Sequence, residues 1–184
     1  MPDPLQYAFN KVSGLTRQTA LYAGNAFDRV FRAASLVQAG QTPFETLYTD
    51  GLVSLRYYPP LAEDFIELDG EMIDVERTPH KTPIVIVPPL AVNMLIYDLF
   101  PQRSLVRFLR AKGFEVYLID WGVPTRQHSH YNLHTYVAEL LPAYLNRVRE
   151  HSGEQKLSLH GWSLGGMFTL FYSALSRDQF FFFF

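Results

Sequence analysis

The sequence predicts an α/β fold in which helices cover a parallel β-sheet. Two observations support this prediction. Three short, mainly apolar runs have the length and composition of buried strands, namely Ile84–Val87, residues 114–119 and residues 156–160. A segment whose apolar residues recur at helical spacing follows each run, so the predicted order is β, α, β, α, β, α. Such alternation is typical of parallel strands joined by right-handed crossovers.

The predicted helices carry recognisable start and stop signals. Ser104 is an N-cap candidate for a helix that Gly113 ends. Asn132 is the cap candidate for a longer helix, whose apolar stripe continues to residue 148 and which Gly153 ends. Pro142 lies off that stripe, and we expect it to kink the helix locally. The third helix is predicted over Leu164–Leu175.

The residues before the first buried strand are less regular. Apolar residues at spacings of three to four predict one or two helices over residues 12–38, although Gly14 and Gly24 argue against a single unbroken helix. Residues 52–58 are predicted to form a strand that a proline pair ends, and residues 72–76 a weaker one.

Composition excludes several classes of protein. The formal net charge is -2 and no basic stripe is present, so we expect no nucleic-acid partner. The chain has no cysteine, which excludes disulfides, thiolate metal sites and a cysteine nucleophile. No secretory signal and no 18-residue apolar run is visible, so we expect a cytoplasmic protein without a transmembrane segment.

The histidine cluster has two interpretations, a metal site and a solvated loop. His128, His130 and His134 lie close in sequence, and two histidines four residues apart can share one face of a helix. No carboxylate spacing supports a ligand set there, so a solvated loop is the favoured interpretation. We expect no metal and no cofactor.

The chemically most informative stretch is residues 161–166, Gly-Trp-Ser-Leu-Gly-Gly. It follows a predicted strand and opens a predicted helix, which is the setting of a nucleophile elbow. Gly161 and Gly165 lie two positions on either side of Ser163, where a Cβ would crowd the turn. The pattern therefore predicts Ser163 as a nucleophile; the alternative is a glycine-rich turn with an inert serine.

A serine nucleophile needs donors for the oxyanion that its attack creates. The N–H of Leu164 is one candidate, since it lies where the helix dipole favours negative charge. The loop that begins with Pro88 and Pro89 is the second candidate source, through the N–H of Leu90 or of Ala91. The simpler interpretation is that this proline pair only ends the strand.

Residues 82–123, TPIVIVPPLAVNMLIYDLFPQRSLVRFLRAKGFEVYLIDWGV, together with the elbow, resemble the polyhydroxyalkanoate synthases. These form a branch of the α/β-hydrolase superfamily, and the similarity extends from about Thr42 to about Ser176. The resemblance implies an enzyme that transfers hydroxyacyl groups from coenzyme A thioesters. It implies Ser163 as nucleophile, Leu164 as one oxyanion donor and Ala91 as the other, with a helical N-terminal region.

The elbow departs from this family at one position, because the synthases have cysteine where this chain has Ser163. A thiolate exchanges acyl groups readily with thioesters, whereas an activated serine forms an oxyester, as esterases and lipases do. Hydrolysis or simple acyl transfer is therefore as well supported as polymerisation.

The rest of the catalytic triad is missing from the sequence. In this superfamily the order is Ser, then Asp or Glu, then His. After Ser163 the chain contains Asp178 as its only acid and no histidine. The terminal run of five phenylalanines fits no turn, helix face or strand alternation. We therefore expect an α/β-hydrolase fold truncated after the elbow helix, ending in an artefactual poly-Phe tail and inactive by itself.

Four further polar residues have alternative interpretations. His160 lies near Ser163 in sequence, and local packing is favoured over a catalytic role. Asp120 ends a strand at the catalytic edge, and a turn or capping role is favoured over a displaced acid. Asp98 and Asn93 either shape a substrate entrance or satisfy backbone groups.

The sequence thus predicts three parts: a helical segment 1–42, the N-terminal part of an α/β-hydrolase domain 43–179, and the tail 180–184. The predicted function is serine-nucleophile acyl transfer from, or hydrolysis of, hydroxyacyl esters or thioesters. The expected partners are a small acyl ester or hydroxyacyl-coenzyme A, the latter as substrate. A polyester granule surface and a second copy of the chain are further candidates. The alternative is a non-catalytic interaction or granule-binding module on a degenerate hydrolase fold.

Overall fold

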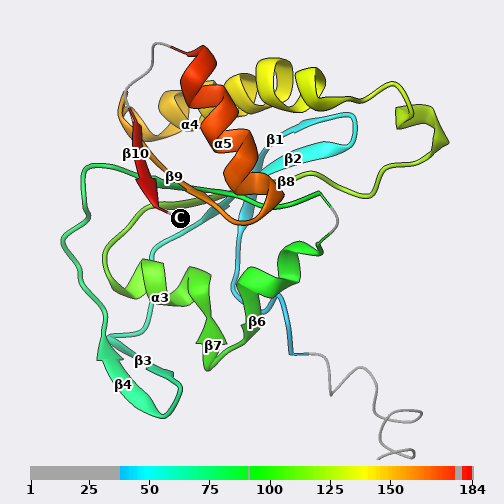
Figure 1. Cartoon of the computed structure of the whole chain (residues 1–184). Coiled ribbons are helices and arrows are strands. Elements are labelled where there is room, and N and C mark those ends of the chain that lie inside the picture. Colours follow the sequence, from blue (N-terminus) through cyan, green and yellow to red (C-terminus); the bar gives the residue numbers. More distant parts are fainter. Residues whose placement is uncertain (1–37, 91, 177–179, 184) are drawn as a thin grey trace, which may run out of the picture. The chain divides into compact units, whose positions relative to one another are not determined.

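The computed structural model describes residues 38–90, 92–176 and 180–183. The chain divides into two compact units, residues 1–38 and residues 39–184, and every element described below belongs to the second (Figure 1). The helices predicted over residues 12–38 lie outside the described residues, except for residue 38. The predicted division at residue 42 therefore stays a prediction.

A six-stranded mixed sheet forms the centre of the second unit. Its strand order is β1-β2-β8-β5-β9-β10. The bounds are Glu45–Asp50 (β1), Val53–Tyr58 (β2), Val116–Asp120 (β8), Ile84–Val87 (β5), Leu157–Gly161 (β9) and Phe180–Phe183 (β10). Strands β8, β5, β9 and β10 are parallel, which confirms the predicted parallel sheet. Strands β1 and β2 form an antiparallel hairpin, and β2 pairs antiparallel with β8.

The helices lie on both faces of this sheet, as predicted. Helices α4 (Leu141–Ser152) and α5 (Leu164–Leu175) are drawn above the sheet in Figure 1, and α3 (Leu105–Ala111) below it. The alternating side chains of β5 enter two separate cores, one with α4 and α5 and the other beside α3. All four residues of β5 are buried, because an aliphatic β-branched strand suits a sheet covered on both faces.

The predicted caps are present. The Ser104 hydroxyl accepts a hydrogen bond from the Arg107 N–H at 3.1 Å and begins α3. Gly113 follows α3 with φ +78°, and Gly153 caps the C-terminal end of α4 with φ +74°. Both angles lie in the left-handed region, where glycine carries no steric cost.

The distortion expected at Pro142 takes the form of a π-helical stretch, Thr135–Leu140, directly before α4. Its widened turn lets the N–H of Leu141 bond to the carbonyl of Tyr136, five residues earlier. Proline has no N–H to continue an α-helical ladder, and a widened turn is one way to accommodate that loss. Asn132 precedes this stretch and accepts a hydrogen bond from the Thr135 N–H at 3.2 Å, in agreement with its predicted capping role.

The expectation that the terminal phenylalanines form no regular element is wrong for residues 180–183, whereas their interpretation as an artefactual tail stays a prediction. Residues Phe180–Phe183 form β10, which pairs in parallel with β9 so that Phe180 lies opposite Leu157. Phenylalanine has a high strand propensity, and the outer edge of β9 offers unpaired backbone groups for a further strand. A run without alternation therefore adopts a regular element.

Smaller elements complete the unit. Hairpin β3–β4 packs Ile66 in a small cluster with Ala111 of α3, and β4 covers most of the weaker strand predicted over residues 72–76. The remaining bounds are Phe65–Leu68 (β3), Glu71–Asp74 (β4), Asp98–Phe100 (β6), Arg103–Ser104 (β7) and the 3-10 turns Met94–Tyr97 (η1) and Arg126–His128 (η2). No helix in the described part of the chain is both long and apolar enough to cross a bilayer.

The Tyr144 hydroxyl joins α4 to the β1–β2 hairpin. It donates to the Val53 carbonyl and accepts from the Asp50 N–H at 3.2 Å. We expect Tyr144→Phe to lower the free energy of unfolding by about 2 kcal/mol, because two backbone groups lose their partner. Urea denaturation measures this loss. Tyr131→Phe is the control, and its free energy of unfolding should change by less than about 0.5 kcal/mol. Equal changes in the two variants would refute the stabilising role of the Tyr144 hydroxyl.

Candidate functional site

Ser163 lies in a strained turn between β9 and α5. Its backbone has φ 54° and ψ −123°, outside the regions that residues with a Cβ normally occupy. Among the described non-glycine residues only Asp69 also has a positive φ. The serine is exposed, and α5 begins at the next residue. The predicted strand, turn and helix are therefore present, with Ser163 at the apex.

The flanking glycines permit this turn by allowing close backbone approaches. A Cβ on Gly165 would collide with the Val87 carbonyl oxygen and lie 2.8 Å from the carbonyl carbon of Pro88. A Cβ on Gly161 would lie 2.7 Å from the Cα of Gly166. Both approaches are closer than real Cβ atoms show, so the predicted steric role of these glycines is confirmed.

The first predicted oxyanion donor lies at the start of α5. The N–H of Gly165 donates to the Trp162 carbonyl at 2.9 Å, whereas no acceptor among the described residues is bonded to the N–H of Leu164. An unpaired N–H in the first turn of a helix is suited to bind an anion. The second predicted donor, Ala91, lies outside the described residues, so that assignment stays a prediction.

The loop after β5 is held against the elbow from two sides. The buried indole N–H of Trp121 donates to the Pro88 carbonyl at 2.7 Å. Gly165 approaches the same segment from α5, as described above. Leu90 and Leu164 both pack against the core cluster on the α4–α5 side of the sheet. The start of this loop, at Pro88, thus lies against the first turn of α5.

His160 makes no hydrogen bond to Ser163 in the described part of the structure. It lies on β9 opposite Ile86 in the register, and it is half-buried. Burial lowers the pKa of its imidazole below the ordinary value of 6.5. These observations agree with local packing, the interpretation favoured from the sequence.

We expect the His160 ring to titrate with a midpoint below pH 6.5, which NMR of the ring protons can measure. In the unfolded chain the His160 ring has the ordinary pKa of 6.5, so as the pH falls it takes up a proton before the ring of the folded chain does. His160 therefore contributes stability above that pH that is lost as the pH falls through it. His160→Gln should flatten this part of the stability profile. A midpoint at or above 6.5 would contradict the burial argument.

Asp120 ends β8 at the same edge of the sheet and has two partners. One carboxylate oxygen accepts the N–H of Gly122 at 3.0 Å, which confirms the predicted turn role. The other pairs with the guanidinium of Arg56 on β2. This ion pair was not predicted, because its members are 64 residues apart in sequence.

The remaining polar candidates satisfy local groups. Asp98 is buried and accepts the N–H and hydroxyl of Thr42 at 2.8 and 2.7 Å. Asn93 accepts the Leu95 N–H at 3.0 Å and caps η1. These bonds support the backbone interpretation of both residues. Asn93 also lines the larger cavity described below, so its alternative role at a substrate entrance stays a prediction.

The histidines of the cluster at residues 128–134 bind polar partners locally. The Nδ1 atom of His128 accepts the Thr125 N–H at 3.1 Å, and His134 pairs with Glu139 at 3.0 Å. Within the described ranges no three His, Asp or Glu side chains are grouped so that they hold a metal ion.

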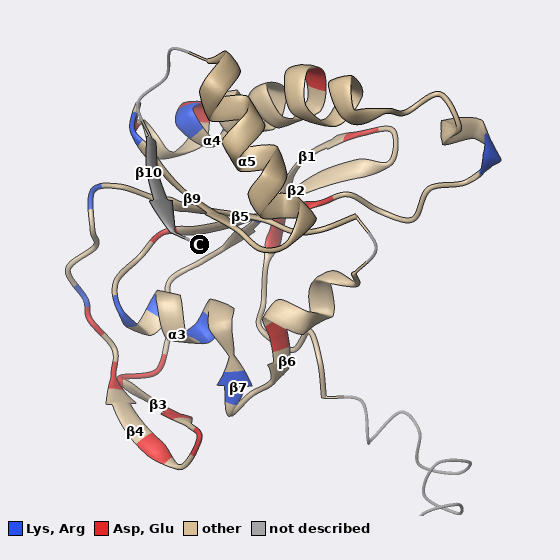
Figure 2. Ribbon diagram, in the orientation of Figure 1, with Lys and Arg blue, Asp and Glu red and all other residues tan. Residues whose placement is uncertain are grey.

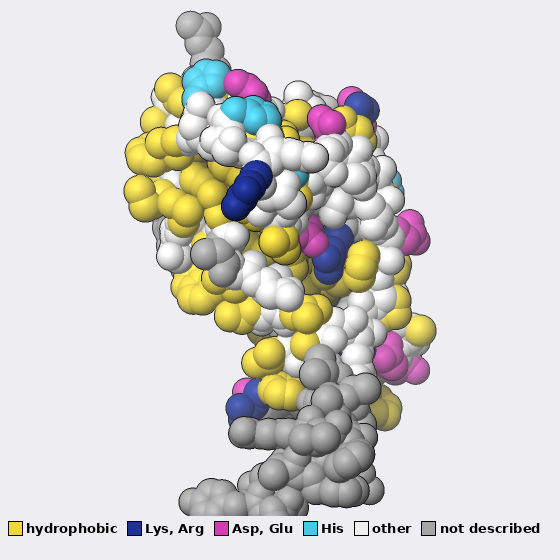
Figure 3. All heavy atoms as spheres, turned by 90° about the vertical axis from the view of Figure 1, so that its right-hand side faces the viewer, with side chains coloured by type: hydrophobic (Ala, Val, Ile, Leu, Met, Phe, Trp, Pro, Cys, Tyr) yellow, Lys and Arg dark blue, Asp and Glu magenta, His cyan; other side chains and the backbone are white. Residues whose placement is uncertain are grey.

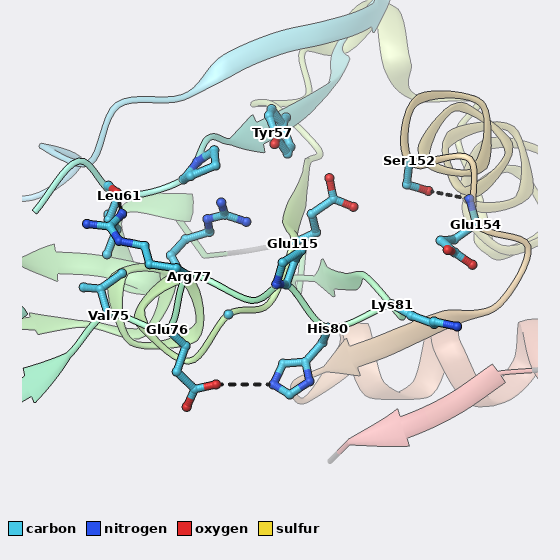
Figure 4. A pocket seen from close by; sticks show the side chains of 14 residues that line it. Tyr57, Leu61, Val75, Glu76, Arg77, His80, Lys81, Glu115, Ser152 and Glu154 are labelled. Atoms are coloured by element: carbon cyan, nitrogen blue, oxygen red, sulfur yellow. Dashed lines mark hydrogen bonds and ion pairs between the residues drawn. The ribbon is translucent and has the colours of Figure 1, made fainter. Parts of the chain in front are cut away.

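Two cavities lie at opposite edges of the sheet. One, of about 720 Å³, is lined by Leu90, Asp120 and neighbouring residues at the edge that carries the elbow. The other, of about 430 Å³, includes Tyr57, His80, Glu115 and Glu154 (Figure 4). His80 and Glu115 precede β5 and β8, and Glu154 follows α4, so this cavity opens at the edge of the sheet away from Ser163. The first cavity thus opens at the same edge of the sheet as the elbow, although no residue of 161–166 lines it.

Comparison with known proteins finds relatives among the polyhydroxyalkanoate polymerases. The chain is 35% identical over 154 residues to a poly(3-hydroxyalkanoate) polymerase subunit from Haloferax mediterranei, covering 84% of this chain and 28% of the relative. It is 34% identical over 143 residues to the corresponding subunit from Haloarcula marismortui, covering 78% and 29%. The chain thus spans under a third of the length of these relatives.

Solved structures include a carboxylesterase from the thaumarchaeon Nitrososphaera gargenis, with 22% identity and a TM-score of 0.42 over 75% of this chain and 42% of that one. A family model described as the alpha/beta hydrolase fold matches residues 82–180, more than half of the chain. This match contains β5, β8, β9 and α5 with the elbow between the last two. The chain belongs to the α/β-hydrolase fold family and is similar within it to the polyhydroxyalkanoate polymerases.

Proposed function

We propose that Ser163 is the nucleophile of an acyl-transfer enzyme acting on hydroxyacyl esters or thioesters. The observation that carries the proposal is the strained backbone of this exposed serine at the start of α5. Strain of this kind costs about 1–3 kcal/mol and persists where the surrounding structure enforces it, commonly at active sites. The close packing of Gly161 and Gly165 is what enforces it here.

In the proposed reaction the Ser163 hydroxyl attacks the substrate carbonyl and becomes an oxyester. The developing oxyanion accepts the N–H of Leu164, with the N–H of Ala91 as the proposed second donor. A histidine must take the serine proton and later return it to the leaving group, and an acid must orient that histidine. We propose that this acid and this histidine belong to the whole protein and lie outside these 184 residues, in the superfamily order Ser, Asp, His.

The proposed substrate class comes from the named relatives, which are poly(3-hydroxyalkanoate) polymerase subunits. A serine at the elbow supports transfer to water or to a small alcohol as well as to a growing polymer. Offering the whole protein 3-hydroxyacyl-coenzyme A and a soluble hydroxyacyl ester distinguishes these outcomes. Polymer with released coenzyme A indicates a synthase, free hydroxy acid indicates a hydrolase, and no turnover of either substrate contradicts the proposal.

A second candidate function is a non-catalytic interaction module. It is favoured by the exposed apolar side of α5, where Met167, Leu170, Phe171 and Leu175 are 40–73% exposed. The helix carries no charged side chain (Figure 2). Figure 3 shows apolar side chains gathered on the left of that view. Exposed apolar patches often mark interaction sites. Covalent labelling of Ser163 by a fluorophosphonate in the whole protein supports the enzyme, and its absence supports the module.

A further inference from the structure

Trp121 joins three of the segments that meet at the elbow edge of the sheet. It follows the last residue of β8, and its side chain is 1% exposed. The indole ring makes edge contacts with the Phe168 ring of α5, at 6.0 Å between ring centres, and with the Tyr136 ring, at 5.5 Å. Its N–H donates to the carbonyl of Pro88, in the loop after β5, at 2.7 Å. One buried side chain therefore links β8, α5 and this loop.

The Pro88 carbonyl lies against α5 as well as against the indole. A Cβ on Gly165 would lie 2.8 Å from both the carbonyl carbon and the carbonyl oxygen of Pro88. Gly165 is two residues after Ser163, in the first turn of the elbow helix. The indole N–H thus fixes the direction of a carbonyl that packs against the turn carrying the serine, since a buried carbonyl keeps the donor that satisfies it.

Covalent geometry carries this direction to the next N–H groups of the loop. The Pro88 carbonyl and the Pro89 nitrogen share one planar peptide group. The ring of Pro89 restricts its φ, so the Cα–C bond of Pro89 is the one freely rotating backbone bond between the held carbonyl and the Leu90 N–H. Two further bonds lead to the N–H of Ala91. Leu90 also packs against the core cluster on the α4–α5 side of the sheet. The indole bond therefore restricts both candidate donor N–H groups.

We propose that Trp121 is a positioning residue for oxyanion stabilisation. Its bond to the Pro88 carbonyl sets the place of the loop N–H that binds, together with the Leu164 N–H, the oxyanion formed at Ser163. This inference rests on the proposed function, since it requires attack by Ser163. Trp121 touches no reacting atom and acts through the loop. A catalytic group displaced by roughly 1 Å costs up to about 100-fold in rate, whereas binding of the neutral ground state depends little on an oxyanion donor.

The test removes the indole N–H and keeps the shape of the ring. Trp121→3-benzothienylalanine in the whole protein places a sulfur atom where the N–H was, so the donor to Pro88 is lost. The rate at which a fluorophosphonate labels Ser163 is followed by intact mass spectrometry over a range of reagent concentrations. We expect the maximal labelling rate to fall about 10- to 100-fold. The half-saturating concentration should change less than about twofold. Trp121→Phe, which also lacks the donor, should lower the maximal rate at least as far.

Tyr144→Phe is the matched control for a purely structural effect. It also removes a buried hydrogen bond, from the Tyr144 hydroxyl to the Val53 carbonyl, within the same core cluster. It should lower the thermal midpoint, as loss of the Trp121 donor should, but it should leave the maximal labelling rate of the folded protein within about twofold. A Trp121 variant that loses stability and keeps its maximal labelling rate would overturn the proposal. A higher half-saturating concentration with an unchanged maximal rate would also overturn it.

Failure of the proposed function has a different signature, which the wild-type protein shows. If the fluorophosphonate does not label Ser163 in the wild type, the proposed chemistry is wrong, and the role of Trp121 is wrong with it. If Ser163 is labelled at the same maximal rate in the wild type and in the 3-benzothienylalanine variant, Ser163 stands as the nucleophile and only the role of Trp121 is refuted.

Discussion

Ser163→Ala is expected to lower acyl transfer by the whole protein by about 10⁶-fold, the loss seen when a serine nucleophile is removed from a comparable enzyme. The variant retains the Leu164 N–H at the start of α5, so substrate binding should persist. What disappears is the atom that forms the acyl bond. Steady-state turnover of a hydroxyacyl ester, with the acyl-enzyme followed by intact mass spectrometry, measures both effects.

Ser173→Ala is the matched control for this substitution. Ser173 lies on the same helix, and its hydroxyl donates to the Leu170 carbonyl at 2.8 Å within α5. Its replacement should change turnover less than about twofold, because it removes only a local bond of about 1 kcal/mol. A Ser163→Ala protein that still forms an acyl-enzyme would show that the elbow is not the site of attack.

Gly165→Ala is expected to destabilise the fold by about 3 kcal/mol, at the upper end of the usual range for overpacking. The added Cβ would collide with the Val87 carbonyl oxygen and press on the backbone of Pro88. Relief requires α5 to move away from β5, and this movement also displaces the turn that holds Ser163. The free energy of unfolding in urea and the rate of fluorophosphonate labelling should therefore fall together.

Gly166→Ala separates this collision from the general effect of alanine in a helix. A Cβ on Gly166 would lie 3.2 Å from the Gly161 carbonyl oxygen, a tight contact that a small shift relieves. Alanine also gains about 0.5–1 kcal/mol of helix propensity over glycine. The net change at Gly166 should be below about 1 kcal/mol. Equal destabilisation by the two substitutions would refute the specific collision at Gly165.

The central elements were predictable because their signals are local. Ile84–Val87 is a continuous β-branched run between prolines, and the strand has the same bounds in the structure. Leu164–Leu175 begins after the elbow serine and also has the predicted bounds. The Ser104 cap joins two residues only three positions apart, so a short sequence motif is enough to predict it.

The edge elements were harder to predict because long-range contacts determine them. Strand β1, Glu45–Asp50, has polar residues at four of its six positions and no buried residue, and its pairing with β2 supplies its hydrogen bonds. The hairpin β3–β4 is largely exposed and has four acidic residues, Glu67, Glu71, Asp74 and the turn residue Asp69. Strand β10 depends on the edge of β9, which no local pattern reveals.

The same contrast applies to the candidate site. The elbow is a contiguous motif, so the positions of Ser163, Leu164 and the glycines followed from the sequence. The partner of Asp120 could not be predicted in this way, because Arg56 lies on β2, which is brought beside β8 only by strand pairing in the folded sheet. The chain holds no histidine after Ser163, so these residues alone do not identify the base.

The most direct test of the central claim is to locate the covalent adduct after the whole protein reacts with a fluorophosphonate and, separately, with a 3-hydroxyacyl thioester. Peptide mass spectrometry of the digested protein assigns the modified residue. We predict both adducts on Ser163, in the peptide that contains residues 161–166. An adduct on another residue, or none with either reagent in the folded protein, would contradict the assignment of Ser163 as the nucleophile.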